Sequence, residues 1–225
     1  MPSSTALLPF EARTGFTIAG STGSGKTVFT YKLLKNHEAM FKAKALKSIL
    51  YCYSVYQPLF SEMENALPQI RFHPGIPDEK SLSELAPAPD DKDHHSILIL
   101  DDLAPQVVKS PAMEKLFTVD NHHKGITTLF LVQNLYQQGP CARSIALNSQ
   151  YIVLLKNVRA GPQIKCLGRQ LFPEKSRLLS EAYGDAMKEA YAYLIVDLFP
   201  HSDSQYRIRT HIFPGEDVLV YQALS

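Results

Sequence analysis

The sequence lacks most of the features that mark membrane, secreted or highly charged proteins. Its formal net charge is only +1 over 225 residues. No apolar run approaches the ~18 residues of a membrane span, and its start does not resemble a signal peptide, so we expect no membrane partner. The three cysteines are scattered and form no C-x-x-C pair. This spacing favours free thiols in a reducing compartment over a zinc site.

Linkers and internal repeats are also absent from the sequence. A chain of this length folding as one unit buries about 70% of its unfolded surface, whereas two units would each be small. The hydrophobic content of 45% and charged content of 20% are ordinary for a globular domain. We therefore expect a single domain over residues 1–225.

The most informative stretch that is present is G-S-T-G-S-G-K-T, residues Gly20–Thr27. A short apolar run, Phe16–Ala19, precedes it and predicts a strand. Helix-forming residues with apolar positions follow it. Strand, glycine-rich turn and helix with the spacing G-x-x-x-x-G-K-[ST] form the phosphate-binding loop. A merely flexible Gly/Ser turn would not need this flanking strand and helix.

Each residue type in the phosphate-binding loop has a chemical reason. Glycines let backbone N–H groups point inward, so that the amides and the helix N-terminus wrap a polyphosphate. We expect Lys26 to reach the outer phosphates and the Thr27 hydroxyl to ligate Mg²⁺. The predicted ligands are ATP and Mg²⁺, and GTP is disfavoured because no N-K-x-D motif occurs. The residues predicted to bind the nucleotide are Gly20, Ser21, Thr22, Gly23, Ser24, Gly25, Lys26 and Thr27.

A second stretch joins an aliphatic run to two carboxylates, Ile97-Leu98-Ile99-Leu100-Asp101-Asp102. Four consecutive large aliphatic residues predict a central parallel strand that is covered on both faces. The carboxyl end of such a strand is where α/β sheets bind ligands. We expect Asp101 to hold the Mg²⁺ that Thr27 also touches, and Asp102 to polarise the attacking water. The alternative is a strand end followed by an acidic turn.

A polar amide follows the next apolar run. Ile126–Val132 predicts a strand, and Gln133 comes directly after it. An amide at this sheet edge would sense the γ-phosphate of a nucleotide or position the attacking water. The alternative is an amide that simply ends a strand.

The remaining apolar patterns predict strands that alternate with helices. Such alternation favours a three-layer α/β fold with a mostly parallel central sheet and right-handed crossovers. Residues 206–213 predict an edge strand or a hairpin with 218–221. Prolines and acidic residues mark 74–93 as exposed loop. Further strands are expected at 48–54, 70–73, 151–155 and 191–198, and helices at 25–36, 59–66, 110–125 and 178–187.

Charge is unevenly distributed along the chain. Residues 51–103 carry 3 basic and 10 acidic side chains, whereas the flanking parts are basic. A basic cluster within 156–177 includes a single acidic residue, Glu174. It could contact phosphates of a nucleotide or of DNA, and a solvated surface explains it equally well. The cluster consists of Lys156, Arg159, Lys165, Arg169, Lys175 and Arg177.

Taken together, these motifs resemble the FtsK–HerA superfamily of P-loop ATPases. The likeness covers nearly the whole chain and is greatest to the genome-packaging ATPases of double-stranded DNA viruses, as in Polinton-like elements, virophages and poxviruses. It implies the three-layer P-loop NTPase fold of the additional-strand, RecA-like class. The segments that carry the resemblance are Gly20–Thr27, Ile97–Asp102, 133–136, 149–159, Asp197-Leu198, 207–210 and Phe213-Pro214.

The resemblance implies a motor that forms a homo-oligomeric ring, a pentamer or a hexamer, and drives double-stranded DNA into a preformed capsid, with the capsid or its portal vertex as a partner. DNA contact would be independent of sequence, and the location would be an infected host cell or the virion. In the family an arginine from a neighbouring subunit reaches the γ-phosphate. Arg159 matches that position best and Arg169 is the second candidate. The chain departs from many relatives in one respect: the second acid is Asp102 where they carry Glu.

Two other classes of function remain open from the sequence. A small-molecule kinase would use an arginine-rich segment such as 156–177 in a lid over its acceptor. A nucleotide-dependent assembly switch would bind ATP without repeated turnover. Transfer of phosphate to an acceptor would indicate the kinase. Absence of steady-state hydrolysis would indicate the assembly switch.

Overall fold

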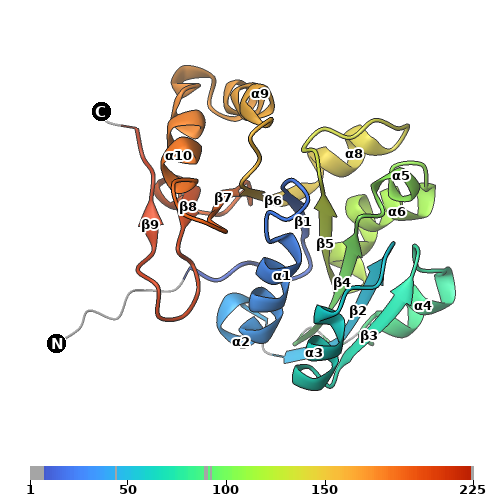
Figure 1. Ribbon diagram of the computed structural model, residues 1–225. Coiled ribbons are helices and arrows are strands. Elements are labelled where there is room, and N and C mark those ends of the chain that lie inside the picture. Colours follow the sequence, from blue (N-terminus) through green and yellow to red (C-terminus); the bar gives the residue numbers. More distant parts are fainter. Residues whose placement is uncertain (1–7, 44, 89–90, 92, 224–225) are drawn as a thin grey trace.

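The computed structural model describes residues 8–43, 45–88, 91 and 93–223. Within that part of the chain nine strands form one twisted sheet in the order β3-β2-β4-β5-β1-β6-β7-β8-β9 (Figure 1). The strands are β1 (Gly15–Ala19), β2 (Ala45–Tyr53), β3 (Ile70–Pro74), β4 (His94–Asp101), β5 (Ile126–Val132), β6 (Ser149–Leu155), β7 (Tyr193–Asp197), β8 (Ile208–Thr210) and β9 (Leu219–Val220).

The sheet is mostly parallel, as the sequence predicts. Strands β3, β2, β4, β5, β1 and β6 all run in the same direction. Strand β5 lies between β1, which leads into the phosphate-binding loop, and β4, which ends at Asp101. This one additional strand between the two motif-bearing strands confirms the predicted fold class.

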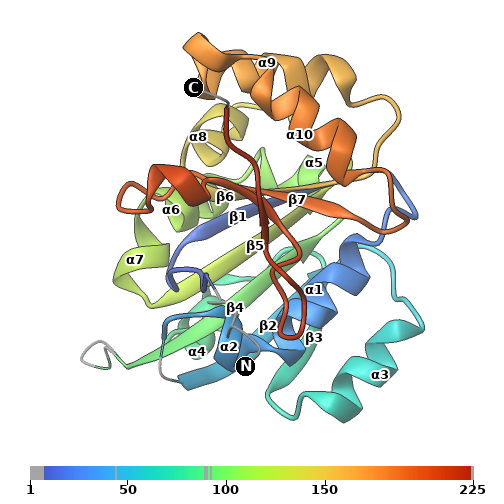
Figure 2. The same ribbon diagram turned by 90° about the vertical axis from the view of Figure 1, so that its left-hand side faces the viewer.

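Helices cover both faces of the sheet and complete three layers (Figures 1 and 2). One face packs on α1 (Lys26–Lys35), α2 (His37–Met40) and α3 (Leu59–Ala66). The other face packs on a larger set of helices. These are α4 (Glu79–Leu85), α5 (Ala104–Val107), α6 (Pro111–Lys115), α8 (Ala142–Leu147), α9 (Gly161–Leu171) and α10 (Leu178–Ala186).

The aliphatic run of β4 shows why the strand must be central. Ile97 and Ile99 point into the core beneath α1, and Leu98 and Leu100 point into the opposite core. All four side chains are fully buried. Alternate side chains of a strand face opposite sides of a sheet, so only a strand covered on both faces buries four in succession.

The C-terminal strands extend the sheet with antiparallel pairs. Strand β7 runs antiparallel to β6, and β8 and β9 form the predicted hairpin. Arg209 on β8 forms an ion pair with Asp197 on β7 at 2.9 Å, and the two side chains are only 2% and 4% exposed. Both belong to segments that carry the family resemblance, and here they join two strands.

Several elements differ from the sequence predictions. Helix α4 lies in the stretch predicted to be loop, where Asp78 caps it by accepting a hydrogen bond from the Ser81 N–H at 2.7 Å. The helix predicted over 110–125 is divided into α6, a π-helical turn (Leu116–Asp120) and α7 (Asn121–His123). Helices α8 and α9 are not predicted. Residues 89, 90 and 92 of the predicted loop lie outside the described part of the chain.

Over the described residues, none of the helices is both long and apolar enough to reach across a bilayer. The three cysteines are free, with Cys52 and Cys141 buried and Cys166 half-buried. Burial raises the pKa of the Cys52 thiol to about 12. A thiol with such a pKa stays protonated at neutral pH and is a poor nucleophile.

Candidate active site

The phosphate-binding loop connects the end of β1 to the start of α1 (Figure 1). It lies at the side of the sheet formed by the carboxyl ends of the parallel strands, which we call the sheet edge below. Gly23 and Gly25 have φ angles of 76° and 94°, in the left-handed region that favours glycine. A Cβ atom on Gly20 would lie 2.4 Å from the Ser24 hydroxyl oxygen and 2.9 Å from the Leu155 Cβ. The positive φ angles therefore favour glycine at Gly23 and Gly25, and the lack of space for a Cβ atom requires it at Gly20.

Lys26 is half-buried against the backbone of its own loop. Its ammonium donates hydrogen bonds to the carbonyl oxygens of Gly20 at 2.8 Å and Ser21 at 3.1 Å. Burial lowers the pKa of Lys26, and the charges of Asp101 and Asp102 oppose that shift. The positive charge of Lys26 is therefore stabilised by the carboxylates of Asp101 and Asp102 beside the loop.

The Thr27 hydroxyl and the Asp101 carboxylate meet beside the loop. Thr27 Oγ1 lies 3.5 Å from Asp101 Oδ2, and Asp101 is only 4% exposed. The Tyr51 hydroxyl, on the neighbouring strand β2, donates a hydrogen bond of 2.7 Å to the same oxygen. Burial raises the pKa of Asp101, whereas the Tyr51 hydrogen bond and Lys26 lower it. The Thr27 hydroxyl and the Asp101 carboxylate thus place two oxygen ligands close together, and Mg²⁺ prefers oxygen ligands.

Tyr51 was not predicted as a site residue. Its hydroxyl is buried, and burial together with the adjacent Asp101 raises its pKa well above the ordinary tyrosine value. It therefore stays protonated and donates to the carboxylate. The available signal was a tyrosine inside the apolar part of the strand, between Leu50 and Cys52, because a buried hydroxyl requires a hydrogen-bond partner.

Asp102 and Gln133 come together at the same edge of the sheet. Asp102 is exposed and has a φ of 55°, which turns the chain directly after β4. The Gln133 side-chain amide donates to Asp102 Oδ1 at 3.1 Å. The structure thus pairs the second carboxylate with the amide that follows β5, and both side chains reach solvent.

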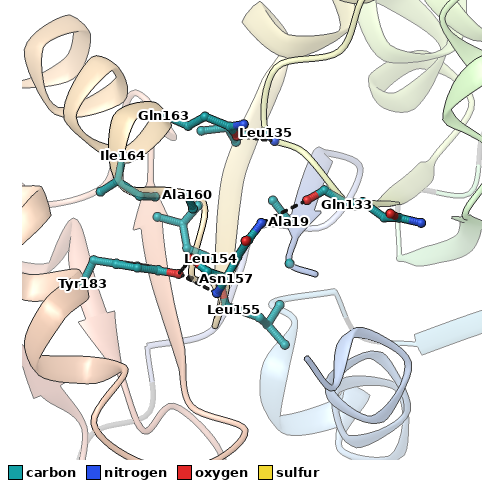
Figure 3. A pocket seen from close by; sticks show the side chains of 11 residues that line it. Ala19, Gln133, Leu135, Leu154, Leu155, Asn157, Ala160, Gln163, Ile164 and Tyr183 are labelled. Atoms are coloured by element: carbon teal, nitrogen blue, oxygen red, sulfur yellow. Dashed lines mark hydrogen bonds between the residues drawn. The ribbon is translucent and has the colours of Figure 1, made fainter. Parts of the chain in front are cut away.

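Asn157 links the end of β5 to the segment after β6. Its side-chain amide donates to the Gln133 carbonyl oxygen at 3.4 Å, and its Oδ1 accepts from the Arg159 N–H at 3.0 Å. The Tyr183 hydroxyl, on α10, accepts from the Asn157 N–H at 2.9 Å and donates to the Leu155 carbonyl oxygen at 3.0 Å. Figure 3 shows Asn157 between Gln133 and Tyr183. Sequence reasoning gave no reason to single out Asn157.

The two predicted arginines lie away from the phosphate-binding loop. Arg159 is exposed in the turn between β6 and α9, and its guanidinium makes no hydrogen bond or ion pair with the described residues. Arg169, on the last turn of α9, lines a groove of about 760 Å³ with Lys165 and Arg177. Within the described chain, the structure brings neither guanidinium into contact with Lys26 or Asp101.

Solved structures with the same fold include viral packaging ATPases. The B204 DNA-packaging ATPase from Sulfolobus Turreted Icosahedral Virus is 16% identical, with a TM-score of 0.55 over 96% of this chain and 100% of that one. This chain has the fold of a viral genome-packaging ATPase. The B204 genome-packaging NTPase of Sulfolobus turreted icosahedral virus 2, solved with AMPPCP, is 13% identical, with a TM-score of 0.53 over 94% of this chain and 98% of that one.

A bacterial protein shares the fold as well. EssC ATPases 2 and 3 from Geobacillus thermodenitrificans are 12% identical, with a TM-score of 0.50 over 93% of this chain and 39% of that one. These neighbours confirm the fold that the resemblance implies. No protein-family model matches the sequence, and a search of curated proteins finds no match.

Proposed function

We propose that this protein is an ATP-hydrolysing subunit of a motor that packages double-stranded DNA. The observation that carries the proposal is the convergence of the phosphate-binding loop, Thr27 and Asp101 at one sheet edge, with Asp102 and Gln133 beside them. The packaging role is supported by the shared fold of the two B204 ATPases, one of which was solved with the ATP analogues ATP-gammaS and AMPPCP.

The residues of the loop fit a polyphosphate. Glycines at Gly20, Gly23 and Gly25 keep side chains out of the loop, and the buried Ser24 hydroxyl has no hydrogen-bond partner within the described chain. Backbone amides and the N-terminus of α1 would hold the phosphates. Lys26 would exchange its carbonyl partners for the outer phosphate oxygens, which carry more negative charge.

Thr27 and Asp101 would hold Mg²⁺, with Tyr51 fixing the Asp101 carboxylate through its 2.7 Å hydrogen bond. When bound, Mg²⁺ supplies positive charge beside the β- and γ-phosphate oxygens. Asp102 would accept a hydrogen bond from the attacking water. Gln133, already hydrogen-bonded to Asp102, would hold that carboxylate in place and respond to the γ-phosphate.

The partners follow from the same proposal. A motor that moves any sequence must grip phosphates rather than base edges, and the groove lined by Lys165, Arg169 and Arg177 offers three cations. Subunits would assemble as a ring of five or six, with Arg159 completing the site of a neighbour. The motor would act at the capsid or portal vertex of a virus, in the infected cell or with the virion.

We expect steady-state ATP hydrolysis that requires Mg²⁺ and increases when duplex DNA is added. Release of free phosphate is measured with and without DNA, beside a mass measurement of the oligomer. Lys26→Ala should lower the rate by at least a hundredfold, since it removes charge stabilisation of the transferred phosphoryl group. Lys35→Ala, an exposed lysine on the same helix, is the matched control and should hydrolyse ATP normally.

Other outcomes identify the competing functions. Transfer of the γ-phosphate to a small acceptor instead of water would indicate a kinase. Tight ATP binding without turnover, in the presence of DNA and in an assembled ring, would indicate a switch. Hydrolysis that survives Lys26→Ala would contradict the proposed site itself.

A further inference from the structure

Among the cavities lined by described residues, two reach the phosphate-binding loop. One reaches Gly20 but has a volume of only about 10 Å³, which is smaller than a ligand needs (Figure 3). The other, of about 510 Å³, begins at Gly25 and lies between α1, the segment before β7 and residues 210–217. Small-molecule sites typically have volumes of about 300–1,000 Å³. This second cavity, which we call the α1–β7 cavity, has room for the rest of a nucleotide whose phosphates occupy the loop.

The mouth of the α1–β7 cavity carries two exposed apolar side chains. Tyr191 is 70% exposed and Val28, the residue directly after Thr27, is 55% exposed. Tyr191 lies against the loop, because a Cβ atom on Gly25 would be 3.1 Å from its Cδ1 atom. An aromatic ring in this position offers a free face within reach of the nucleotide.

Backbone strain is concentrated around the same cavity. In the described part of the chain, four residues other than glycine have positive φ angles, and two of them, Tyr191 at 57° and His211 at 55°, line it. A third is Asp102, at the end of β4. Strained backbone of this kind persists where surrounding structure enforces it, and it gathers at functional sites.

The far wall of the cavity is fixed by its own contacts. The rings of Phe29, Tyr193 and Phe213 meet edge to face with centroids 4.9–5.6 Å apart. Lys32 pairs with Glu216 and lies 4.2 Å above the Phe213 ring, while the Tyr193 hydroxyl donates to Glu216 at 2.9 Å. The rings of this wall are thus engaged with one another, whereas the ring of Tyr191 is exposed.

Sheet topology explains how Tyr191 reaches the loop. Strand β7 is antiparallel to β6, with Tyr193 opposite Leu155. The start of β7 therefore lies at the edge where the parallel strands end, close to Gly20 and Gly25, which Leu155 also approaches. The segment between β8 and β9 packs on α1 through Phe213 and Phe29 and lines the other side of the cavity, and its position over α1 can be followed in Figure 2.

We propose that the α1–β7 cavity binds the purine base of the nucleotide, stacked on the ring of Tyr191 and packed at its edge against Val28. This inference rests on the proposed function and assigns the part of the same site that recognises the base. Removing one base–aromatic stack typically weakens binding about ten- to hundredfold. The phosphates would be held by the loop and Lys26 rather than by the ring, so the loss should be confined to ligands that carry a base.

The first test compares ATP with inorganic tripolyphosphate, both as Mg²⁺ complexes, by isothermal titration calorimetry of the full chain. Tyr191→Ala should raise the Kd for ATP about tenfold or more and leave the Kd for tripolyphosphate unchanged. Tyr191→Phe should bind ATP as the wild type does, because the ring remains. Tyr206→Ala, at another exposed tyrosine that does not line the cavity, is the control and should change neither.

The second test uses the absence of tryptophan from the sequence. Tyr191→Trp places a single indole in the cavity, and ATP should quench its fluorescence with a midpoint equal to the calorimetric Kd. Tripolyphosphate should not quench it. Tyr206→Trp should be insensitive to both ligands.

The outcomes separate the base site from the proposed function. If Lys26→Ala abolishes ATP binding while Tyr191→Ala binds ATP as tightly as the wild type, the base site is overturned and the ATPase proposal stands. Equal weakening of ATP and tripolyphosphate by Tyr191→Ala also overturns it, since the ring would then act through the loop. A wild-type chain that binds no ATP overturns both.

Discussion

At the scale of single residues, the burial of His95 makes the stability of the protein depend on pH. His95 is 1% exposed, and its Nδ1 lies 3.1 Å from the Thr127 hydroxyl oxygen. Burial lowers its pKa to about 4, with smaller contributions from the charges of His37 and Arg13. An unfolded histidine takes up its proton near pH 6.5. Between pH 6.5 and 4 the unfolded chain therefore binds more protons than the folded one.

We therefore expect that His95 does not lower the free energy of unfolding above pH 6.5. Below that pH the free energy of unfolding should fall, by up to about 3 kcal/mol as the pH approaches 4. Denaturant unfolding at several pH values between 7.5 and 4.5 measures this slope. His95→Asn should flatten it, and His122→Asn, at an exposed histidine, should not. Parallel slopes for the wild type and His95→Asn would contradict the expectation.

Individual residues differed in how far the sequence could predict them. The residues of Gly20–Thr27 are identifiable because the spacing itself encodes the backbone geometry of the loop. Tyr51 and Tyr191 are not, because their positions depend on which strands are neighbours. Tyr51 reaches Asp101 only because β2 lies beside β4, and Tyr191 reaches the loop only because β7 is antiparallel. Short-range patterns do not encode those pairings.

At the scale of elements, the groove between α9 and α10 is the strongest candidate for contact with DNA. Lys165 and Arg169 are four residues apart and so share one face of α9, and Arg177 precedes α10. All three are exposed and none forms an ion pair within the described residues, although Glu181 also lines the groove. Unpaired cations along a groove attract the phosphates of a nucleic acid.

We expect the double substitution Lys165→Gln/Arg169→Gln to weaken duplex binding and to lower the salt slope of log K by about 2, since each phosphate contact contributes about 0.9. Fluorescence anisotropy of labelled duplexes between 50 and 200 mM salt measures both quantities. The weakening should be equal for unrelated sequences. Lys80→Gln/Lys109→Gln removes the same charge from exposed sites outside the groove and should leave the slope unchanged. An unchanged slope in the groove variant would exclude this surface.

Helix α9 also shows why some elements were not predicted. It begins with Gly161-Pro162 and contains Gly168, and glycine is a poor residue for a helix interior. The structure gives the reason: a Cβ atom on Gly168 would lie 2.7 Å from the Ser176 carbonyl oxygen. Close packing against the chain that leads into α10 requires the glycine, so tertiary contact overrides local preference. The long apolar strands, which follow from burial alone, were predicted well.

At the scale of the whole molecule, the exposed Arg159 predicts that hydrolysis depends on assembly. Its guanidinium has no hydrogen-bond or ion-pair partner within the described chain, and an arginine supplied by a neighbour accelerates phosphoryl transfer by about 10³–10⁵. We expect the rate per subunit to rise with protein concentration in parallel with the oligomer measured by mass photometry. Arg159→Ala should lower kcat within that range, whereas Arg143→Ala, also exposed, should not.

Mixing two inactive variants provides the sharper form of this experiment. Lys26→Ala subunits keep Arg159, and Arg159→Ala subunits keep an intact loop, so mixed rings should regain part of the activity. Failure of the mixture to recover, when both variants assemble, would show that Arg159 does not act across a subunit boundary. Arg169 would then be tested in the same way.

The central position of β1 has a consequence for the order in which the protein acquires its structure. Phe16 pairs with Leu129 on one side and with Tyr151 on the other, whereas β2 pairs with β3 and with β4 over much shorter separations along the chain. On a ribosome, β2–β4 can therefore form a subsheet while β1, already translated, still waits for both partners. Strand β1 would be locked in place only after β6 has been made, although it precedes β2, β3 and β4 in the chain. Nascent subunits could not hold a nucleotide before that point.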